Sequence, residues 1–217
     1  MEGNGVSPTA SVERMTRQRV DWAAGRWTRE PAGTRLDGGT LVVAASEGSD
    51  YWRTTHYGFV HDDGHGLLGE WPADSAVEVT FDSSSLTALY DQAGVLLYAG
   101  PEQWVKAGLE LSDGVLHLGA VVTNGVSDWS MAPVPDWAGQ RITIRASRGG
   151  VAGDAVTIRA RTETSGWRSV RVAPFTAGAA SAGPLVCAPM RGDLEVRFTE
   201  WALAPADRDL HEDPPLD

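Results

Sequence analysis

One stretch of the chain combines groups suited to acid–base chemistry with groups suited to ligand binding. The runs 104–111 and 115–122 have the composition of strands, and Asp113-Gly114 between them favours a two-residue turn, because both central positions of that turn need positive φ. Counting outward from the turn places Glu110 opposite His117. The spacing therefore predicts a hairpin that carries either an acid–base unit or a static cross-strand pair.

The same register separates the hairpin into two unlike faces. On one face every cross-strand pair is apolar, as expected for a buried face: Leu109 with Leu118, Ala107 with Ala120, and Val105 with Val122. On the other face, four side chains surround a pair of glycines: Trp104, Lys106, Glu110 and His117 around Gly108 and Gly119. Because glycines project no side chains, a ligand can approach the backbone there.

Two interpretations of this second face remain open. In the first, a sugar ring stacks on Trp104 and the charged groups bind its hydroxyls; if a reaction follows, Glu110 or His117 is the base and Lys106 stabilises a developing anion. In the second, the face is solvated, the glycines accommodate curvature of the sheet, and Lys106 and Glu110 form an ordinary surface pair.

The preceding strand is expected to extend this face. Within the run 89–98, the residues Gln92, Gly94 and Tyr98 share one side, and a short connection leads from Tyr98 into Trp104. The run should therefore pair antiparallel beside the hairpin, which makes Gln92 a further candidate contact for the ligand.

A cluster of histidines and an aromatic residue precedes that strand. Trp52, His56 and His65 are candidate ligand contacts, and His61 lies between the two histidines, near carboxylates. The spacing matches no closed zinc pattern, and Asp-Asp-Gly at 62–64 is first of all a turn. We therefore predict no metal and no cofactor.

A polar segment after the hairpin, residues 123–130, is interpreted as a loop that carries Asp128 and Trp129 over the sheet as ligand contacts. The alternative is that Trp129 closes the edge of the core and that Ser127 and Asp128 form a turn.

The elements that must position these residues are short strands separated by Gly, Asp, Asn and Pro. Strands are predicted at 40–44, 57–61, 76–82, 89–98, 104–111, 115–123, 141–147, 154–160, 167–172 and 194–202. A helical pattern occurs only around 12–22. The domain boundaries that follow are an N-terminal extension at 1–20, a β-sandwich at 21–203, and an acidic flexible tail at 204–217.

Composition limits the class of partner. With 217 residues, 42% of them hydrophobic, the chain can bury one sizeable core. A formal charge of −11 and the lack of any run of basic residues disfavour nucleic acid and acidic membranes, and no stretch is apolar enough to span a bilayer. Cys187 is the single cysteine, so no intramolecular disulfide can form; we expect it to be a buried small residue in a cytoplasmic protein.

The chain resembles a known group, the regulation-of-enolase-protein-like family, a domain-of-unknown-function family within the concanavalin A-like lectin/glucanase superfamily. The resemblance covers about residues 22–201, and its motifs are Asp50-Tyr-Trp-Arg53, His56-Tyr-Gly58, Gly64-His65, Tyr90-Asp-Gln-Ala-Gly94, the run 104–110, and Ser127-Asp-Trp-Ser130.

This resemblance implies a jelly-roll sandwich of two antiparallel sheets, in a superfamily that contains lectins, glucanases and polysaccharide lyases. The Glu-x-Asp-x-x-Glu strand motif of its retaining glucanases is absent from this sequence. We therefore expect a protein that binds a small carbohydrate or sugar-like metabolite on the concave sheet, with or without modifying it. The alternatives are a lyase, isomerase or hydrolase that uses Glu110, His117 and Lys106, and a regulatory domain that binds a partner protein.

Overall fold

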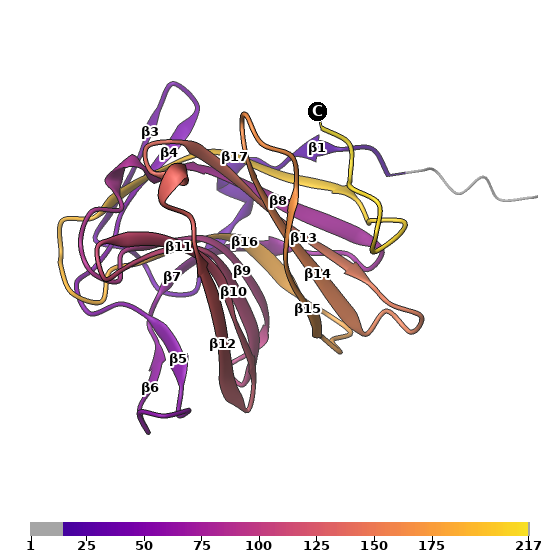
Figure 1. Ribbon diagram of the computed structural model, residues 1–217, viewed down its shortest axis with the longest axis horizontal. Helices are drawn as coiled ribbons and strands as arrows, with labels where there is room; N and C mark the ends of the chain where they lie inside the picture. Colours follow the sequence, from indigo (N-terminus) through magenta and orange to yellow (C-terminus); the bar gives the residue numbers. More distant parts are fainter. Residues whose placement is uncertain (1–14, 217) are drawn as a thin grey trace, which may run out of the picture.

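Short strands with alternating apolar residues build two antiparallel sheets that pack face to face (Figure 1). The computed structural model describes residues 15–216. In that part of the chain, one sheet has eight strands: β1 (Gln18–Arg19), β3 (Gly33–Asp37), β4 (Thr40–Ala44), β8 (Ser75–Asp82), β13 (Arg141–Gly149), β14 (Ala155–Thr162), β15 (Arg168–Pro174) and β17 (Glu195–Pro205). The prediction of an all-β sandwich is confirmed.

The second sheet carries the candidate site. It has seven strands, in the order β12 (Val126–Pro133), β11 (Val115–Asn124), β10 (Gln103–Ser112), β9 (Gln92–Gly100), β16 (Ser181–Cys187), β7 (His65–Glu70) and β2 (Arg26–Trp27). Because side chains alternate along a strand, one face of this sheet packs into the core with residues such as Val95, Ala107 and Leu118. The opposite face, called the outer face below, points away from the eight-stranded sheet.

A separate hairpin covers part of the outer face. Its strands are β5 (Tyr51–Arg53) and β6 (Val60–Asp62), and it projects from the sandwich beside β12 (Figure 1). Tyr51 and Trp52 from this hairpin pack on residues of the outer face to form a second apolar cluster: Leu96, Trp104, Val121, Leu185 and Cys187. Part of the outer face is therefore buried, and only the remainder can receive a ligand.

Most of the predicted strands are present, with ends that differ by a few residues. One predicted strand, 57–61, is wrong: residues up to Phe59 form the tip of the β5–β6 hairpin, and β6 begins at Val60. The predicted loop 123–130 is also wrong, because residues from Val126 onward form β12 and pair with β11. The strands β3, β7 and β16 have no counterpart in the sequence-based prediction.

Helical structure in the described part of the chain is limited to three 3-10 turns: η1 (Trp22–Ala24), η2 (Ser83–Ser85) and η3 (Pro135–Trp137). None of the helices described at 15–216 is long and apolar enough to cross a membrane. The helix expected around 12–22 is not formed from residue 15 onward, where β1 pairs with β17, and residues 12–14 lie outside the described residues.

Charge holds the segment after β17 against the sandwich. Asp207 is nearly buried and forms ion pairs with Arg145 and Arg159. The Arg159 guanidinium also donates hydrogen bonds to the backbone oxygens of Leu210 and Glu212. A flexible tail was expected because this segment has few apolar residues. Its composition does not show that the arginines of β13 and β14 bind it through ion pairs and hydrogen bonds.

Candidate functional site

The structure confirms the predicted register of the central hairpin. Asp113 and Gly114 adopt φ values of 52° and 76°, as a two-residue turn with two left-handed positions requires. Pairing outward from the turn then places Glu110 opposite His117, and Gly108 opposite Gly119. The predicted neighbour β9 adds Gln92 opposite Glu110.

A row of three glycines crosses the outer face, because Gly94 in β9 aligns with Gly108 in β10, which aligns with Gly119 in β11. A Cβ at Gly94 would lie 2.0 Å from the Ala107 backbone oxygen, and one at Gly108 would lie 2.2 Å from the Ala93 oxygen. The row is therefore required by the close approach of the strands themselves, and it also leaves the surface above them without side chains.

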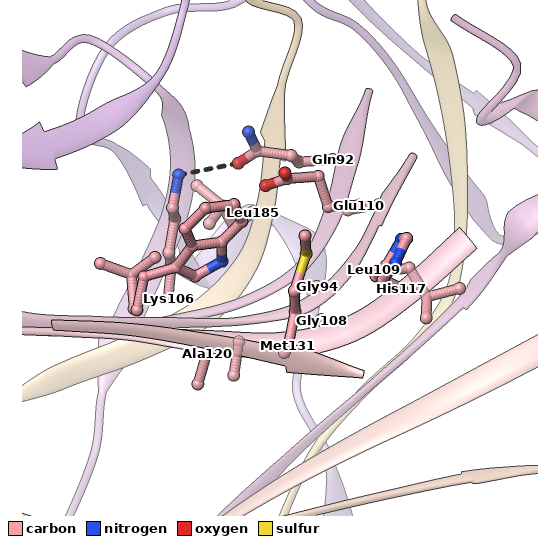
Figure 2. Close-up of a pocket in the computed structure, with 15 residues that line it drawn as sticks. Gln92, Gly94, Lys106, Gly108, Leu109, Glu110, His117, Ala120, Met131 and Leu185 are labelled. Carbon is pink, nitrogen blue, oxygen red and sulfur yellow. Dashed lines mark hydrogen bonds between the residues drawn. The ribbon is translucent and has the colours of Figure 1, made fainter. Parts of the chain in front are cut away.

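Above this row is a shallow hollow that opens to solvent, with about 350 Å³ of empty space counting the solvent at its mouth. Figure 2 shows Gln92, Lys106 and Glu110 grouped on one side, Met131 rising from the floor, and His117 away from that group. Trp129 and Met131 from β12 and Leu185 from β16 add apolar groups on opposite sides of the hollow, with the polar groups between them.

Lys106 organises the polar groups of the hollow. It is the only lysine in the sequence. Its Nζ donates hydrogen bonds to Asp50 Oδ1 at 2.6 Å and to Gln92 Oε1 at 2.8 Å. Burial lowers the pKa of this amine, but the Asp50 carboxylate and other anionic neighbours outweigh the effect and raise the pKa overall. Lys106 is thus a charged group with one N–H left for a ligand.

Glu110 is the polar group of the hollow whose bonding capacity is unused. Within residues 15–216 its carboxyl group has no hydrogen-bond partner. Burial raises its pKa, opposed by the nearby Lys106 ammonium, and this shift favours the protonated form. A carboxyl group in this state can both donate to and accept from a ligand hydroxyl.

His117 does not form the direct acid–base pair with Glu110 that its register position suggested. Its Nδ1 donates to the Val115 backbone oxygen at 2.9 Å, and no hydrogen bond joins the imidazole to Glu110. The imidazole lines the hollow, with Nε2 free to accept a hydrogen bond.

Trp104 lies on the predicted face but cannot serve as the predicted platform. It is 1% exposed, and the Tyr51 ring packs edge-on against it at 5.3 Å between centroids. The register of the hairpin defines which side of the sheet the Trp104 indole faces. Whether the indole is buried depends on the segment around Tyr51, about fifty residues earlier in the chain, which packs over it.

His65, another predicted ligand contact, is a buried structural residue with 0% exposure. Its Nε2 accepts from the Ser46 backbone N–H at 3.0 Å, and its Nδ1 donates to the Arg29 backbone oxygen at 3.1 Å. Both bonds require the neutral imidazole, and burial lowers its pKa in agreement. The ring therefore joins two loops and does not reach a ligand.

The remaining predicted contacts lie around Trp129, at the rim of the hollow. Trp129 is 39% exposed, so it can act as the platform that Trp104 cannot provide. On its other side is an open cleft that it shares with Trp52, His56 and Asp128. The Asp128 carboxylate also pairs with Arg171 at 2.7 Å.

Two residues that line the hollow were not predicted, Met131 and Leu185, and neither was Asp50, which accepts a hydrogen bond from Lys106. Asn124-Gly125 is itself a hairpin signal, but counting outward from a two-residue turn there pairs Gly119 with Ser130, whereas in the structure Gly119 pairs with Met131. Asp50 and Leu185 come from distant parts of the chain, and the sequence carries no local signal for their positions. No cluster of three or more His, Cys, Asp or Glu groups that could hold a metal ion occurs in the described residues.

Fold and site together define a class: a β-sandwich whose seven-stranded sheet has a small, partly polar hollow on its outer face. The chain belongs to the family described as "Protein of unknown function (DUF1349)", whose model matches residues 27–206. It is 35% identical to "Regulation of enolase protein 1" of Saccharomyces cerevisiae over 200 residues, which is 90% of this chain and 97% of the yeast protein.

Solved structures confirm the architecture. A functionally unknown protein from Saccharomyces cerevisiae matches with a TM-score of 0.77 and 34% identity, over 86% of this chain and 98% of that one. A GH43 protein from Bacillus licheniformis matches with a TM-score of 0.67 and 14% identity, over 91% of this chain and 40% of that chain. A xylan beta-1,4-xylosidase from Bacillus halodurans matches with a TM-score of 0.63 and 12% identity, over 93% of this chain and 41% of that chain. At these identities the GH43 matches show a shared fold.

Proposed function

We propose that the protein binds a small, neutral, hydroxylated ligand of the monosaccharide type in the hollow above the glycine row. The observation that carries this proposal is the Glu110 carboxyl group, which is half-buried in the lining of the hollow, has no hydrogen-bond partner in residues 15–216, and lies near the Lys106 ammonium. A half-buried carboxyl group without a protein partner is available to bind the hydroxyls of a ligand.

The charges of the site favour a neutral ligand over an anionic one. Asp50 already neutralises Lys106, and burial raises the pKa of Glu110 above that of an ordinary glutamate. The formal charge of −11 on the whole chain adds a field that repels anions. Sugar acids and sugar phosphates should therefore bind more weakly than the parent sugars.

The apolar groups of the hollow suit a sugar ring as well. Trp129 is partly exposed at its rim, and the C–H face of a pyranose or furanose ring can pack on an indole. The enclosed volume of the hollow is only about 30 Å³, so a sugar ring would lie across its open mouth and not inside it. Carbohydrate-active GH43 proteins share the fold, which agrees with this ligand class.

The first test replaces Glu110 by glutamine. Titration calorimetry against glucose, galactose, xylose and arabinose should show binding to the wild type and affinity weakened about tenfold or more in Glu110→Gln, since one or two ligand hydrogen bonds are lost. Glu70→Gln, an exposed glutamate at the end of β7, is the matched control and should bind like the wild type. A folded wild type that binds none of these sugars, and gives no Trp129 fluorescence change, would contradict the proposal.

The same variant makes a prediction about pH. Because the folded-state pKa of Glu110 is raised above its ordinary value of 4.5, this group stabilises the fold below that value, and the contribution is lost as pH rises through the folded-state pKa. Urea unfolding at a series of pH values should therefore show wild-type stability falling relative to Glu110→Gln above pH 4.5. At neutral pH the variant should be at least as stable as the wild type. A less stable variant would indicate a structural role for Glu110.

A second candidate function is acid–base chemistry on the bound ligand. It is favoured by the position of Glu110, a carboxyl group of raised pKa next to the Lys106 ammonium, which is suited to proton transfer. Proton NMR of each bound sugar in D2O would show it as exchange of a carbon-bound proton that disappears in Glu110→Gln.

A further inference from the structure

We infer that the open cleft on the far side of Trp129 is a second ring-binding subsite, so that the ligand is a glycan or glycoside of at least two rings. This inference rests on the proposed function, since it assigns the first ring to the hollow above the glycine row. The cleft lies between the tip of the β5–β6 hairpin and β12, and contains about 880 Å³ of space including the solvent at its mouth.

Trp129 connects the two spaces, because its side chain lines both the hollow and the cleft. Within the cleft it meets Trp52 at 6.3 Å between ring centroids and an interplanar angle of 88°. Trp52 in turn meets Tyr57 at 5.7 Å and 63°. The three aromatic rings thus form a continuous, angled wall that begins at the rim of the first site.

The polar groups of the cleft complement the hydroxyl edge of a sugar ring. Several polar atoms are already used within the fold: Trp52 Nε1 donates to the Thr55 oxygen, and Ser127 Oγ accepts from the Arg53 backbone N–H. His56 lies at the rim together with Asp128, whose carboxylate also pairs with Arg171. Aromatic faces with an imidazole and a carboxylate at their edge match a ligand that has a C–H face and a hydroxylated rim.

The hairpin tip that forms one wall is held in a costly backbone conformation. Thr54 and His56 have φ values of 57° and 66°, a left-handed region that a β-branched residue such as threonine rarely adopts. The Thr54 N–H donates to the Phe59 oxygen at 2.7 Å, and the Gly58 N–H donates to the Thr54 oxygen at 2.6 Å. Backbone strain of this kind is concentrated at binding sites, where it holds side chains in place before the ligand arrives.

The tip is also fixed to the sheet. The Arg53 side chain donates from Nε to the Gly125 oxygen at 2.9 Å, and the Arg53 backbone N–H donates to Ser127 at the start of β12. Tyr57 is nevertheless 56% exposed, and it stacks on Phe59, which is 44% exposed. A hairpin that is fixed to the sheet and leaves the exposed Tyr57 ring lining an open cleft is arranged to bind a ligand there.

The test compares ligands of increasing length. Xylose, xylobiose and xylotriose, and the series glucose, cellobiose and cellotriose, are titrated by calorimetry into the wild-type protein. We expect affinity to rise about tenfold from one ring to two in the series whose first ring binds the hollow, because the second ring gains an aromatic contact.

Two variants separate the subsites. Tyr57→Ala should weaken the disaccharide about tenfold and leave the monosaccharide unchanged, whereas Glu110→Gln should weaken both. Tyr57→Phe, which keeps the ring, should bind the disaccharide within about twofold of the wild type. Tyr90→Ala removes another partly exposed tyrosine, away from the cleft, and should have no effect on either ligand.

The possible failures are distinct. If the monosaccharide binds and its affinity is the same as that of the longer ligands, or if Tyr57→Ala binds the disaccharide like the wild type, the second subsite is overturned and the proposed function stands. If no ligand of either length binds to the folded protein, both are overturned.

Discussion

Replacing Lys106 by methionine is expected to abolish ligand binding and to lower the free energy of unfolding by about 3 kcal/mol. Methionine is unbranched and only one atom shorter than lysine, so packing of the stem changes little, but Asp50 and Gln92 lose the ammonium to which both are hydrogen-bonded. The carboxylate then remains in a mostly buried position without its counter-charge. Urea unfolding measures the loss of stability, and calorimetry with the best ligand measures the loss of binding.

A double-mutant cycle with Asp50→Asn provides the control for Lys106→Met. Because the two charges stabilise each other, the double variant should lose clearly less than the sum of the two single losses. Simple additivity would show that the pair is not coupled. Since Lys106 is the only lysine, a sample labelled with isotopic lysine also gives one side-chain signal from the site, which should shift when a ligand binds.

Replacing Gly94 by alanine is expected to destabilise the protein by about 3 kcal/mol and to disturb the hollow at the same time. The added Cβ would lie 2.0 Å from the Ala107 oxygen and 2.7 Å from Gly108 Cα, so β9 and β10 must move apart. The Ala107 oxygen and Gly108 Cα are backbone atoms of the central strand β10, so neither can rotate away from the added Cβ. Chemical denaturation measures the loss, and sugar titration shows whether the floor of the hollow has moved.

Gly33→Ala is the matched control for Gly94→Ala. Gly33 also lies in a strand, β3, but the nearest atom to a Cβ placed there is the Ala44 Cβ at 4.0 Å. Its stability should stay within about 1 kcal/mol of the wild type, with a small gain from the less flexible unfolded chain. Equal stability of the two variants would mean that the strands can separate at little cost and that the glycine row is not required by the sheet.

Local signals predicted the central hairpin and its neighbour well. Turn chemistry at Asp113-Gly114 sets the register, and the register sets the alternation of side chains, so Lys106, Glu110 and Gln92 were placed on one face correctly. The same kind of signal at Asn124-Gly125 was overlooked, and β12 was therefore interpreted as a loop.

The errors share one cause, which is contact between segments far apart in the chain. Trp104 is buried because Tyr51 packs against it. Both ring nitrogens of His65 are hydrogen-bonded to backbone groups of Ser46 and Arg29. The segment after β17 is held by Arg145 and Arg159, whose positions in β13 and β14 do not follow from the composition of that segment.

By itself, the sequence determined the sandwich, the hairpin register, and the face on which an ammonium and a carboxyl group meet above glycines. These features follow from turns and alternation, which act over a few residues. Only the tertiary structure decided that Asp50 neutralises Lys106, that Glu110 has no hydrogen-bond partner in residues 15–216, and that Trp129 is partly exposed whereas Trp104 is buried. Those outcomes depend on which distant segment covers each side chain. Contacts between distant segments produce no local or periodic pattern in the sequence from which they could be predicted.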